Sequence, residues 1–554
     1  MTPPEVLQPY RAAGAISRDD ISTAAMLVEM ALRSGAEQPP LLVWLGLCLA
    51  LRTVRDGHTC VDLDRIGDWA GDIDLTRADC PLWPTDPAPW ITDLQAATVL
   101  VGTVGERKPL ILDGHRLYLA RSLAEEASIA DALTRRVAAK TIHILLGGPG
   151  TGKTTTVAKN LAARFATLSA GHTLPRIALA APTGKAAARM TEAVKQACAA
   201  AGGNDPLLQW IASAPARTIH KLLGFHPNRT ERFAYHAKRW LPYDLVIVDE
   251  ASMISSTLMH HLLAAVAPEA EVRLVGDPHQ LASVDAGTVL GDIAIFADAR
   301  FQDHPLHERI ETLEKIHRQE SSAILGLGQA VRTGKAADAF AILEAGMSDV
   351  EWIDPTAAKK LEAVTRAVVV HAAALRDVAT TGGPEAILAM QSKLQVLCGH
   401  REGDMGVSGW NARIEKGIGV RATDPWYVGR PVMVTRNTSS LRLSNGDVGV
   451  VVPAGDRREA LFGLPSHSLR VPVARLEDID TVHAFTIHKS QGSEYDHVVV
   501  VLPERPSRIV TRELLYTGIT RARTKVTIVG TRDVITAAIK TPIRRATGLA
   551  ARLA

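Results

Sequence analysis

Apolar residues recur at helical spacing through the first ninety residues of the chain. They mark two segments, 21–32 and 41–54, and a proline-rich passage follows them. Two short apolar segments, 110–112 and 117–119, then surround an Asp-Gly turn and are typical of paired strands. The pattern predicts a mainly helical N-terminal domain at residues 1–122, which is either a plain packing module or a partner-docking domain.

From residue 123 the pattern changes to short apolar runs separated by longer amphipathic segments. The apolar runs lie at residues 142–146, 177–181, 245–248 and 272–275. Runs of this kind are typical of strands that are buried on both faces, and the segments between them are long enough for crossover helices. We therefore expect an α/β domain at residues 123–354, with a parallel sheet whose ligands bind beyond the carboxyl ends of the strands.

Residues 355–554 carry no second glycine-rich loop, and their periodicity turns to short strands. Asn445-Gly446 is a strong hairpin signal before an apolar segment. We expect a small β-barrel at about residues 426–478, inserted in a second domain at 355–554.

Composition and charge place the chain among globular proteins with sizeable cores. Of its 554 residues, 46% are apolar and 22% are charged, which excludes a disordered or fibrous chain. The net charge of +3 gives no broad basic field, so any contact with nucleic acid is confined to a local groove. The 5 cysteines have no CxxC spacing, which argues against a zinc site and a disulfide framework and favours a reducing, cytoplasmic compartment. The longest apolar run, 41–51, is too short to cross a bilayer, so we expect no membrane partner.

The strand predicted at 142–146 leads into a glycine-rich loop that opens a segment of helical spacing. The loop consists of Gly147, Gly148, Pro149, Gly150, Thr151, Gly152, Lys153, Thr154 and Thr155. Glycines let backbone N–H groups approach phosphates closely, and the helix N-terminus adds positive potential. In such a loop Lys153 reaches the β- and γ-phosphates, and the Thr154 hydroxyl holds Mg²⁺. The sequence therefore predicts a nucleotide-binding P-loop.

Polar side chains also follow the third and fourth strands of this sheet. Asp249 and Glu250 come directly after 245–248, and Gln280 follows 272–275. Beside a P-loop, we expect Asp249 to hold Mg²⁺ and Glu250 to orient and deprotonate the attacking water. Gln280 is a candidate sensor of the γ-phosphate. The plainer alternative for the acidic pair is that it caps a helix.

A second anion site is predicted along the same edge of the sheet. Thr183 and Lys185 follow 177–181 at the start of a helix, and Thr218 and His220 offer similar donors. This site is too far along the sheet to serve the same nucleotide, so we expect it to bind nucleic-acid phosphates. Ordinary helix starts are the alternative.

Basic residues recur in two further places. The segment 226–240 interleaves them with aromatic side chains, a mixture that suits base stacking with phosphate contacts and equally suits a solvated hairpin with one apolar face. Arg318 and Arg521 are candidate arginine fingers, cations that neutralise charge developing on the γ-phosphate.

The order of these motifs resembles the motif set of superfamily 1 DNA helicases, and most closely that of the RecD family, the alpha subunits of exonuclease V (RecBCD). The matching segments are GGPGTGKT, APTGKAAAR, TIHKLLG, VIVDEAS, GDPHQLASVDAG, EKIHRQ, FTIHKSQGSEYD and LYTGITRAR. The resemblance covers about residues 20–554 and is weakest in the N-terminal part.

The resemblance implies a P-loop NTPase with two RecA-like domains, ATP and Mg²⁺ between them, and an SH3-like β-barrel insertion. It implies an ATP-dependent helicase that moves 5′ to 3′ on single-stranded DNA, enters at double-stranded DNA ends, and works in the bacterial cytoplasm in double-strand break repair and recombination. Its partners would be RecB-like and RecC-like subunits in a heterotrimer, with the N-terminal domain docked on the RecC-like one. Matching motifs assign catalysis to Lys153, Asp249, Glu250, Gln280, Arg318 and Arg521, a nucleotide contact to Glu494, and strand contacts to Thr183, Lys185, Thr218, His220, His488 and Ser490.

One departure from the family pattern concerns nucleotide selectivity. Helicases of this type usually have a glutamine upstream of the P-loop that reads the adenine, but no glutamine occurs between Gln95 and Gly147, and Ala130 stands about where it is expected. A second hypothesis keeps the ATP site but makes the chain a regulatory subunit that only switches a partner nuclease. No Asp/Glu-x-Lys constellation follows a strand outside the ATP motifs, so we expect the nuclease site in a partner.

Overall fold

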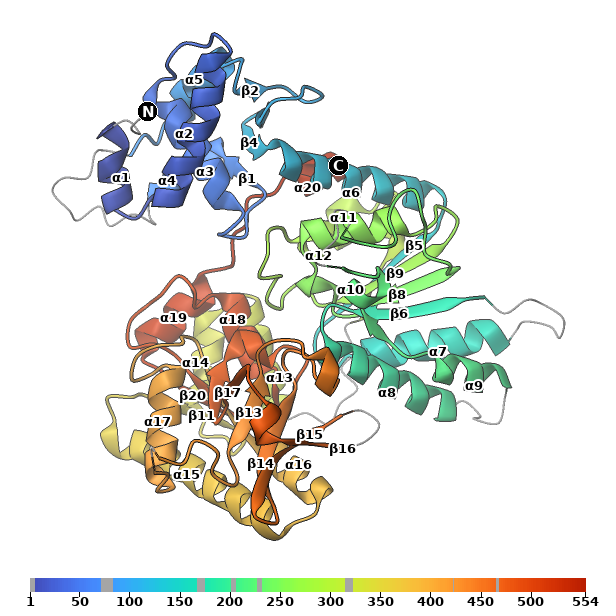
Figure 1. Cartoon of the computed structure of the whole chain (residues 1–554), viewed down its shortest axis with the longest axis vertical. Coiled ribbons are helices and arrows are strands. Elements are labelled where there is room, and N and C mark those ends of the chain that lie inside the picture. The colour runs from blue at the N-terminus through green and yellow to red at the C-terminus, as the bar shows by residue number, and fades with distance from the viewer. Residues whose placement is uncertain are drawn as a thin grey trace.

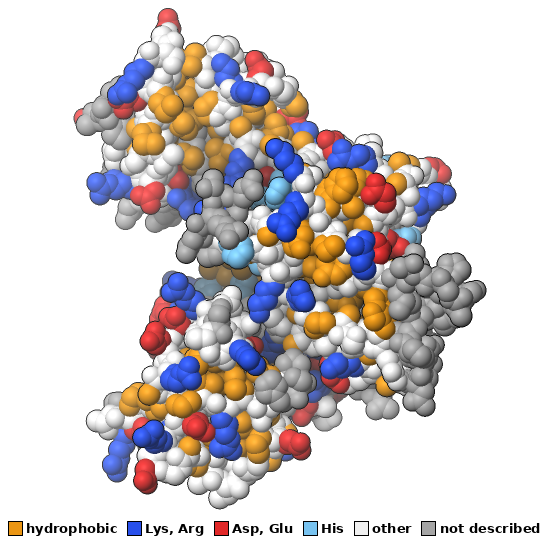
Figure 2. All heavy atoms as spheres, turned by 45° about the vertical axis from the view of Figure 1, so that its right-hand side comes forward, with side chains coloured by type: hydrophobic (Ala, Val, Ile, Leu, Met, Phe, Trp, Pro, Cys, Tyr) orange, Lys and Arg blue, Asp and Glu red, His pale blue; other side chains and the backbone are white. Residues whose placement is uncertain are grey.

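The computed structural model describes residues 5–70, 83–166, 175–200, 206–226, 232–313, 322–421, 423–464 and 468–554. Figure 1 shows an N-terminal unit beside two larger α/β units, the second of which carries a further sheet. On the face drawn in Figure 2, lysine and arginine side chains are scattered among acidic and apolar ones. Within the described ranges, no helix combines the length and the apolar character needed to cross a membrane.

The N-terminal unit packs helices against a small sheet of order β1-β4-β3-β2. Its helices are α1 (Gln8–Ala12), α2 (Arg18–Arg33), α3 (Leu41–Thr53), α4 (Ile66–Ala70) and α5 (Pro87–Ala96), and its strands are β1 (Cys60–Asp62), β2 (Val101–Gly102), β3 (Leu110–Asp113) and β4 (Arg116–Leu119). Helix α3 is the longest apolar run of the sequence, and it is buried on all sides. The predicted pair of strands at 110–112 and 117–119 forms the antiparallel hairpin β3–β4, which turns at Gly114 with a φ of 57°.

The first α/β unit contains a six-stranded parallel sheet of order β10-β5-β9-β8-β6-β7. Its elements are α6 (Ala120–Ala138), β5 (Ile142–Gly147), α7 (Lys153–Ala166), β6 (Ile177–Ala181), α8 (Gly184–Ala200), α9 (Pro206–Ser213), β7 (Arg217–Thr218), α10 (Ile219–Leu222), β8 (Leu245–Val248), α11 (Ser256–Ala265), β9 (Glu271–Gly276), α12 (Val289–Ala294) and β10 (Ile310–Leu313). Separate hydrophobic clusters cover the two faces of this sheet, as expected for strands that are apolar along their whole length.

The second α/β unit contains a five-stranded parallel sheet of order β11-β20-β19-β12-β18. Its elements are α13 (Ser322–Arg332), α14 (Ala336–Glu344), β11 (Val350–Ile353), α15 (Ala358–Thr381), α16 (Pro384–Lys393), β12 (Leu394–Cys398), α17 (Val407–Gly417), β18 (Ala484–Thr486), β19 (Tyr495–Val501), α18 (Arg512–Ile519), β20 (Ala522–Val529) and α19 (Arg532–Lys540). Two parallel-sheet units, one of them with a P-loop, agree with the predicted fold class.

The insertion in the second unit is a five-stranded antiparallel sheet of order β16-β15-β14-β13-β17. Its strands are β13 (Pro431–Val434), β14 (Val448–Ala454), β15 (Arg457–Gly463), β16 (Ser468–Pro472) and β17 (Ile479–Thr481). The Asn445-Gly446 turn lies between β13 and β14, with a φ of 92° at Gly446. Among the described strands the outer two, β16 and β17, do not pair with each other, so a closed barrel stays a prediction.

The sheets also divide the chain at a different point from the one expected. Strand β11 pairs with β20, and helices α13 and α14 pack in the hydrophobic core of the second sheet. Apolar periodicity predicts that a segment is a strand, but it does not predict which sheet the strand joins. The sequence pattern alone therefore leaves residues 322–353 in the first domain. We therefore propose that the second domain begins near residue 322 instead of 355.

The end of the chain returns from the second unit to the first. After α19, the chain crosses to α20 (Leu549–Leu553), whose Leu549 and Leu553 join the core of the first unit against α6 (Figure 1). On the way, the Thr547 hydroxyl donates to the buried Asp292 carboxylate at 3.0 Å, and the Thr288 hydroxyl donates to the same oxygen at 3.2 Å. Burial raises the pKa of Asp292 to about 7.

We expect Asp292→Asn to stabilise the protein at high pH. A carboxyl whose folded pKa is about 7 stabilises the fold fully only below its unfolded pKa of about 4, and this contribution is lost as the pH rises through 7. The amide keeps the acceptor oxygen and never ionises. Melting temperatures measured at pH 5 and pH 8 should show the variant gaining on the wild type by about 4 °C at the higher pH. If the melting temperatures of variant and wild type differ by the same amount at pH 5 and pH 8, Asp292 is ionised in the folded protein throughout this range.

Candidate active site

The P-loop connects β5 to α7 through backbone conformations that only glycine adopts easily. Gly150 and Gly152 have φ angles of 75° and 76°. A Cβ on Gly147 would lie 2.7 Å from the Thr151 hydroxyl and 3.1 Å from the Leu313 carbonyl oxygen on β10. The Lys153 ammonium lies over the loop and donates to the carbonyls of Gly147 and Gly148 at 2.6 and 2.9 Å. The loop therefore places one cation and the start of a helix at the carboxyl end of β5.

The acidic pair stands at the end of β8, beside the P-loop. The Thr154 hydroxyl donates to the Asp249 carboxylate at 2.7 Å, and the backbone N–H of Glu250 donates to its other oxygen at 2.8 Å. Glu250 has left-handed backbone angles, φ 53° and ψ 41°, which are uncommon for a residue with a side chain and often mark functional sites. Burial raises the pKa of the Glu250 carboxyl and Asp249 raises it further, while Arg521 and Lys153 oppose the shift.

Gln280 and Arg521 meet across the interface between the two α/β units. The Gln280 amide donates to Asp277 at 3.2 Å, and its oxygen accepts from the Arg521 guanidinium at 3.1 Å. Arg521 also donates to the Thr517 carbonyl at 3.1 Å and is only 3% exposed. Burial lowers the pKa of this guanidinium, and the Glu250 carboxylate counteracts the shift. A buried cation of the second unit thus faces the acidic residues of the first.

Further hydrogen bonds join the same two segments, and they involve residues to which the sequence assigned no role. The Tyr516 hydroxyl donates to Asp277 at 3.2 Å, and the backbone N–H of Leu281 donates to the Thr517 hydroxyl at 3.1 Å. The Gln491 amide donates to the Leu281 carbonyl at 3.1 Å. Tyr516 and Thr517 lie inside the LYTGITRAR motif, so the motif itself was the available signal. The segment around Gln280 is therefore bonded directly to the second unit.

These residues enclose a cavity of about 710 Å³ at the domain interface. The predicted residues that line it are Gly148, Pro149, Gly150, Gly152, Lys153, Thr154, Thr155, Asp249, Glu250, Gln280, Glu494 and Arg521. Gly147 and Thr151 do not line this cavity, and the Thr151 hydroxyl donates to the Gly148 carbonyl at 2.8 Å within the loop. Glu494 accepts from Arg189 at 2.6 Å, an ion pair between the two units that the sequence did not reveal. Arg318 lies outside the described residues.

Carboxylate and hydroxyl oxygens are the ligands that Mg²⁺ prefers, and Asp249 and Thr154 bring one of each together at the P-loop. Elsewhere in the described ranges, no group of three or more His, Cys, Asp or Glu side chains is arranged to hold a metal ion. Ala130, where an adenine-reading glutamine was expected, is buried in the hydrophobic core of the first unit. Base recognition therefore has no polar side chain at that position.

The residues predicted to contact a nucleic-acid strand do not share one cavity. The hydroxyls of Thr183 and Thr218 cap helices by accepting from the backbone N–H groups of Ala186 and Lys221, at 3.2 and 3.3 Å. These caps are compatible with both interpretations of the two segments. Desolvation lowers the pKa of Lys185 to about 8.

On the second unit, His488 and Ser490 belong to a short 3₁₀ helix, 487–490. Ser490 is fully buried and donates to the Ile487 carbonyl at 2.6 Å. Its hydroxyl is therefore directed into the protein. Burial lowers the pKa of His488, and the nearby Arg545 lowers it further.

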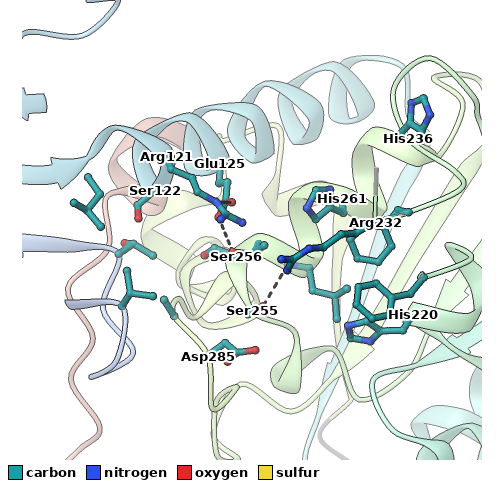
Figure 3. A pocket seen from close by; sticks show the side chains of 18 residues that line it. Arg121, Ser122, Glu125, His220, Arg232, His236, Ser255, Ser256, His261 and Asp285 are labelled. Carbon is teal, nitrogen blue, oxygen red and sulfur yellow. Dashed lines mark hydrogen bonds and ion pairs between the residues drawn. The ribbon is translucent and has the colours of Figure 1, made fainter. Parts of the chain in front are cut away.

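His220 lines a second cavity, of about 850 Å³, between the N-terminal unit and the first α/β unit (Figure 3). Phe233 packs between His220 and His261, with ring centroids 6.2 and 4.6 Å from theirs, and Phe225 lies 5.3 Å from it. Arg121, Arg232 and Asp285 supply charge around this aromatic group (Figure 3). Of the segment 226–240, residues 227–231 lie outside the described residues, and the choice between base stacking and a solvated hairpin stays open.

Three family models match successive parts of the chain. The N-terminal domain of RecBCD enzyme subunit RecD matches residues 12–118, an AAA domain matches 130–286, and a UvrD-like helicase C-terminal domain matches 481–529. A solved structure of Bacteroides Pif1 bound to single-stranded DNA is 17% identical, with a TM-score of 0.39 over 76% of this chain and 94% of that chain.

Two full-length relatives are RecBCD enzyme subunits RecD. The protein of Mycolicibacterium smegmatis is 41% identical over 94% of this chain and 95% of its own length, and that of Mycobacterium tuberculosis is 38% identical over 99% and 96%. The ATP-dependent RecD2 DNA helicase of Deinococcus radiodurans is 31% identical over 72% of this chain and 48% of its own. With this identity over nearly the whole chain, the protein belongs to the RecD family of RecBCD enzyme subunits.

Proposed function

We propose that this chain is an ATP-driven helicase that translocates on single-stranded DNA as the alpha subunit of a RecBCD-type helicase-nuclease. The observation that carries the proposal is the contact between Gln280 and Arg521 inside the P-loop cavity. Because one residue comes from each α/β unit, a nucleotide bound there touches both of them. A change at its γ-phosphate then changes how the two units close on each other.

The residues of the cavity divide the hydrolytic work among them. Lys153 and the loop N–H groups bind the phosphates, and Thr154 with Asp249 would hold Mg²⁺, which neutralises phosphate charge when bound. Glu250 orients the attacking water and accepts its proton, since its carboxylate lines the cavity directly after Asp249 and beside Gln280. Arg521 supplies positive charge to the γ-phosphate, and Gln280 distinguishes its presence from its absence. Arg318 is a second candidate for an arginine finger, and this assignment rests only on its place in the EKIHRQ motif.

The strand-contacting assignments extend this proposal to DNA. We assign Thr183, Lys185, Thr218 and His220 to one grip on the first unit, and the turn that contains His488 and Ser490 to another on the second. The buried Ser490 hydroxyl stabilises this turn through Ile487 and does not itself face the strand. Each cycle of closure and opening moves one grip relative to the other, which gives directed stepping. The proposed direction of translocation, 5′ to 3′, is taken from the family resemblance. A DNA phosphate beside Lys185 favours its charged form and offsets its lowered pKa.

The proposal for the partner subunits rests on the names of the relatives and on how much of their length the chain matches. RecD proteins that match nearly end to end are named as RecBCD subunits, and the RecD N-terminal model covers residues 12–118. We therefore propose that the N-terminal unit docks on a RecC-like subunit in a heterotrimer with a RecB-like one.

The test of the proposed function is ATP hydrolysis by the full chain, alone and in its complex, with and without single-stranded oligonucleotides. We expect strong stimulation by the strand, together with displacement of a streptavidin block from the 3′ end faster than from the 5′ end. Hydrolysis that ignores DNA in both preparations would contradict a strand-coupled motor. Faster displacement from the 5′ end would reverse the proposed polarity.

We expect the affinity for single-stranded DNA to depend only weakly on salt. Among the six residues assigned to the two grips only Lys185 is a lysine or arginine, and Figure 2 shows no single basic field on the face it draws. With few phosphates neutralised, log affinity against log salt should have a slope no steeper than about −3. Fluorescence anisotropy at several salt concentrations measures this slope. A steeper slope would point to cationic contacts beyond the six proposed.

A further inference from the structure

The segment 541–548 connects the second α/β unit to α20 on the first, and we refer to it as the C-terminal strap (Figure 1). At its start, the Thr541 carbonyl accepts from the backbone N–H of Arg512 at 2.8 Å, and the Ile543 N–H donates to Glu513 at 2.6 Å. Both contacts hold it to α18, the helix that leads to Arg521. The strap therefore begins at the N-terminal end of α18, and Arg521 follows the other end of the same helix.

At its other end, the strap is anchored on buried carboxylates of the first unit. The Gly548 N–H donates to both oxygens of Glu126, at 3.1 and 3.2 Å, and Glu126 is fully buried. Together with the bond from Thr547 to Asp292, this fixes the end of the strap against α6 and α12. The strap thus spans the two units that the proposed motor moves.

Arg545, in the middle of the strap, binds one loop of the first unit through three backbone carbonyls. Its guanidinium donates to Asp285 at 2.7 Å, to Gly287 at 3.2 Å and to Ser283. Burial lowers the pKa of Arg545, and Asp285 counteracts this shift. Three carbonyls in one short loop with one planar cation among them leave the loop little freedom to take another shape.

The backbone of the loop 283–287 is also bonded on two further sides, although its Val284 side chain is 78% exposed. The backbone N–H of Ser256 donates to the Ala286 carbonyl at 2.9 Å, and a Cβ on Gly287 would lie 1.9 Å from the Ser256 hydroxyl oxygen. On the other side, the Gly287 N–H donates to the Gly57 carbonyl of the N-terminal unit at 3.0 Å. The backbone of the loop is therefore hydrogen-bonded to α11, the strap and the N-terminal unit.

The strap is also bonded to the N-terminal unit beside this loop. The Ala546 N–H donates to a ring nitrogen of His58 at 2.9 Å, and the Thr59 N–H donates to the Ala546 carbonyl at 2.9 Å. A Cβ on Gly57 would lie 2.6 Å from the guanidinium carbon of Arg545. Three parts of the chain meet at Arg545 as a result.

The loop 283–287 links the two proposed binding sites. It begins three residues after Gln280, which lines the nucleotide cavity, and Leu281 is bonded to the second unit. Its Asp285 and Ala286 line the cavity that also contains His220 and Arg232 (Figure 3). A displacement of this loop changes both the γ-phosphate sensor and the cavity beside His220.

We infer that Arg545 is a positioning residue that holds the loop 283–287 in the one shape that couples the nucleotide site to the bound DNA strand. The inference rests on the proposed function, since the coupling it describes is that between ATP hydrolysis and single-stranded DNA. It adds that the strap ties this coupling to the N-terminal unit, where a partner subunit would act.

The test compares Arg545→Ala, Arg545→Lys and Arg544→Ala in the full chain. Arg544 is the matched control, because it is the neighbouring arginine and, among the residues that the structure describes, it pairs with the exposed Asp68 alone, at 3.4 Å. We expect Arg545→Ala to lower the ratio of DNA-stimulated to unstimulated ATP hydrolysis about tenfold, since small misplacements of a positioned group reduce rates strongly. Arg545→Lys should restore part of the ratio, because an ammonium still donates to carbonyls, and Arg544→Ala should keep the wild-type ratio.

Amide hydrogen exchange of the peptide that contains residues 283–287 supplies a readout independent of activity. It should rise in Arg545→Ala and stay at the wild-type level in Arg544→Ala. Unchanged exchange and an unchanged ratio in Arg545→Ala would overturn the inference. The inference would also be overturned if Arg545→Ala lowered DNA-stimulated and unstimulated hydrolysis equally, lowered the melting temperature and was not rescued by lysine. Such a result is expected of a residue that only stabilises the fold. If the wild type itself shows no stimulation by DNA, the proposed function fails, and the exchange result alone decides whether Arg545 holds the loop.

Discussion

Lys153→Gln is expected to lower DNA-stimulated ATP hydrolysis by about 10³-fold. Lys153 is the cation that the P-loop presents to the cavity, and its Nζ already lies at the loop carbonyls of Gly147 and Gly148. Glutamine has similar length but no charge, so it loses the stabilisation of phosphate charge that develops as the γ-phosphate leaves, and removal of such preorganised groups costs about 10²–10³ in rate. Steady-state hydrolysis at saturating single-stranded DNA measures the loss.

The matched control for this prediction is Lys195→Gln. Lys195 is an exposed lysine on α8 of the same unit, outside the cavity lining, so the same chemical change should leave hydrolysis within about twofold of the wild type. A Lys153→Gln chain that hydrolyses ATP at the wild-type rate would show that the cavity at the domain interface is not the hydrolytic site.

The same variant, placed in the proposed heterotrimer, distinguishes a motor subunit from a regulatory subunit. A motor whose ATP site is disabled should lose its own strand translocation while the complex remains assembled. A complex that unwinds at the normal rate but loses control of degradation would favour the regulatory hypothesis, in which the ATP cycle only switches a partner. Unwinding assayed from ends that engage one strand polarity at a time makes this distinction visible.

Four of the six strands of the first sheet were predictable because they are largely buried on both faces, whereas β7 and β10 are partly exposed and were not predicted. Each of the four apolar runs expected there falls on a strand, β5, β6, β8 or β9, and the polar motif after each run lies at the carboxyl edge of the sheet. The four runs are only four to five residues long, as strands usually are, whereas the eleven-residue run 41–51 forms the buried helix α3. Parallel strands also bring their ends to one edge of a sheet. Local pattern was therefore enough to place the P-loop, Asp249, Glu250 and Gln280 together.

The features that the sequence did not reveal depend on contacts between distant segments. Strand β11 joined the second sheet, and Arg189 paired with Glu494 more than three hundred residues away. The sequence of the C-terminal strap is typical of an ordinary loop, although its hydrogen bonds join the two α/β units and the N-terminal unit. Periodicity records which residues are buried within an element, but the partner across an interface is set by how whole domains pack.

Arg521→Ala is expected to lower the maximal hydrolysis rate by about 10³-fold while changing the KM for ATP much less, as is typical of arginine fingers. Arg521 is buried at the domain interface and donates to Gln280, Thr517 and Ser493. It therefore acts when the two units close, and its charge matters most in the transition state. Arg521→Lys should recover little, because an ammonium cannot reproduce this planar set of hydrogen bonds.

Arg523→Ala provides the comparison, because Arg523 lines the same cavity but is half exposed and pairs with Glu494 and Asp496 at its rim. Exposed ion pairs contribute little to stability, so the hydrolysis rate of Arg523→Ala should stay within about threefold of the wild type. Gln280→Ala combined with Arg521→Ala should cost scarcely more than Arg521→Ala alone, since side chains in contact that act as a unit are not additive. Additive losses would mean that Gln280 and Arg521 serve separate steps. A normal rate in Arg521→Ala would instead assign the finger to another arginine, with Arg318 as the next to replace.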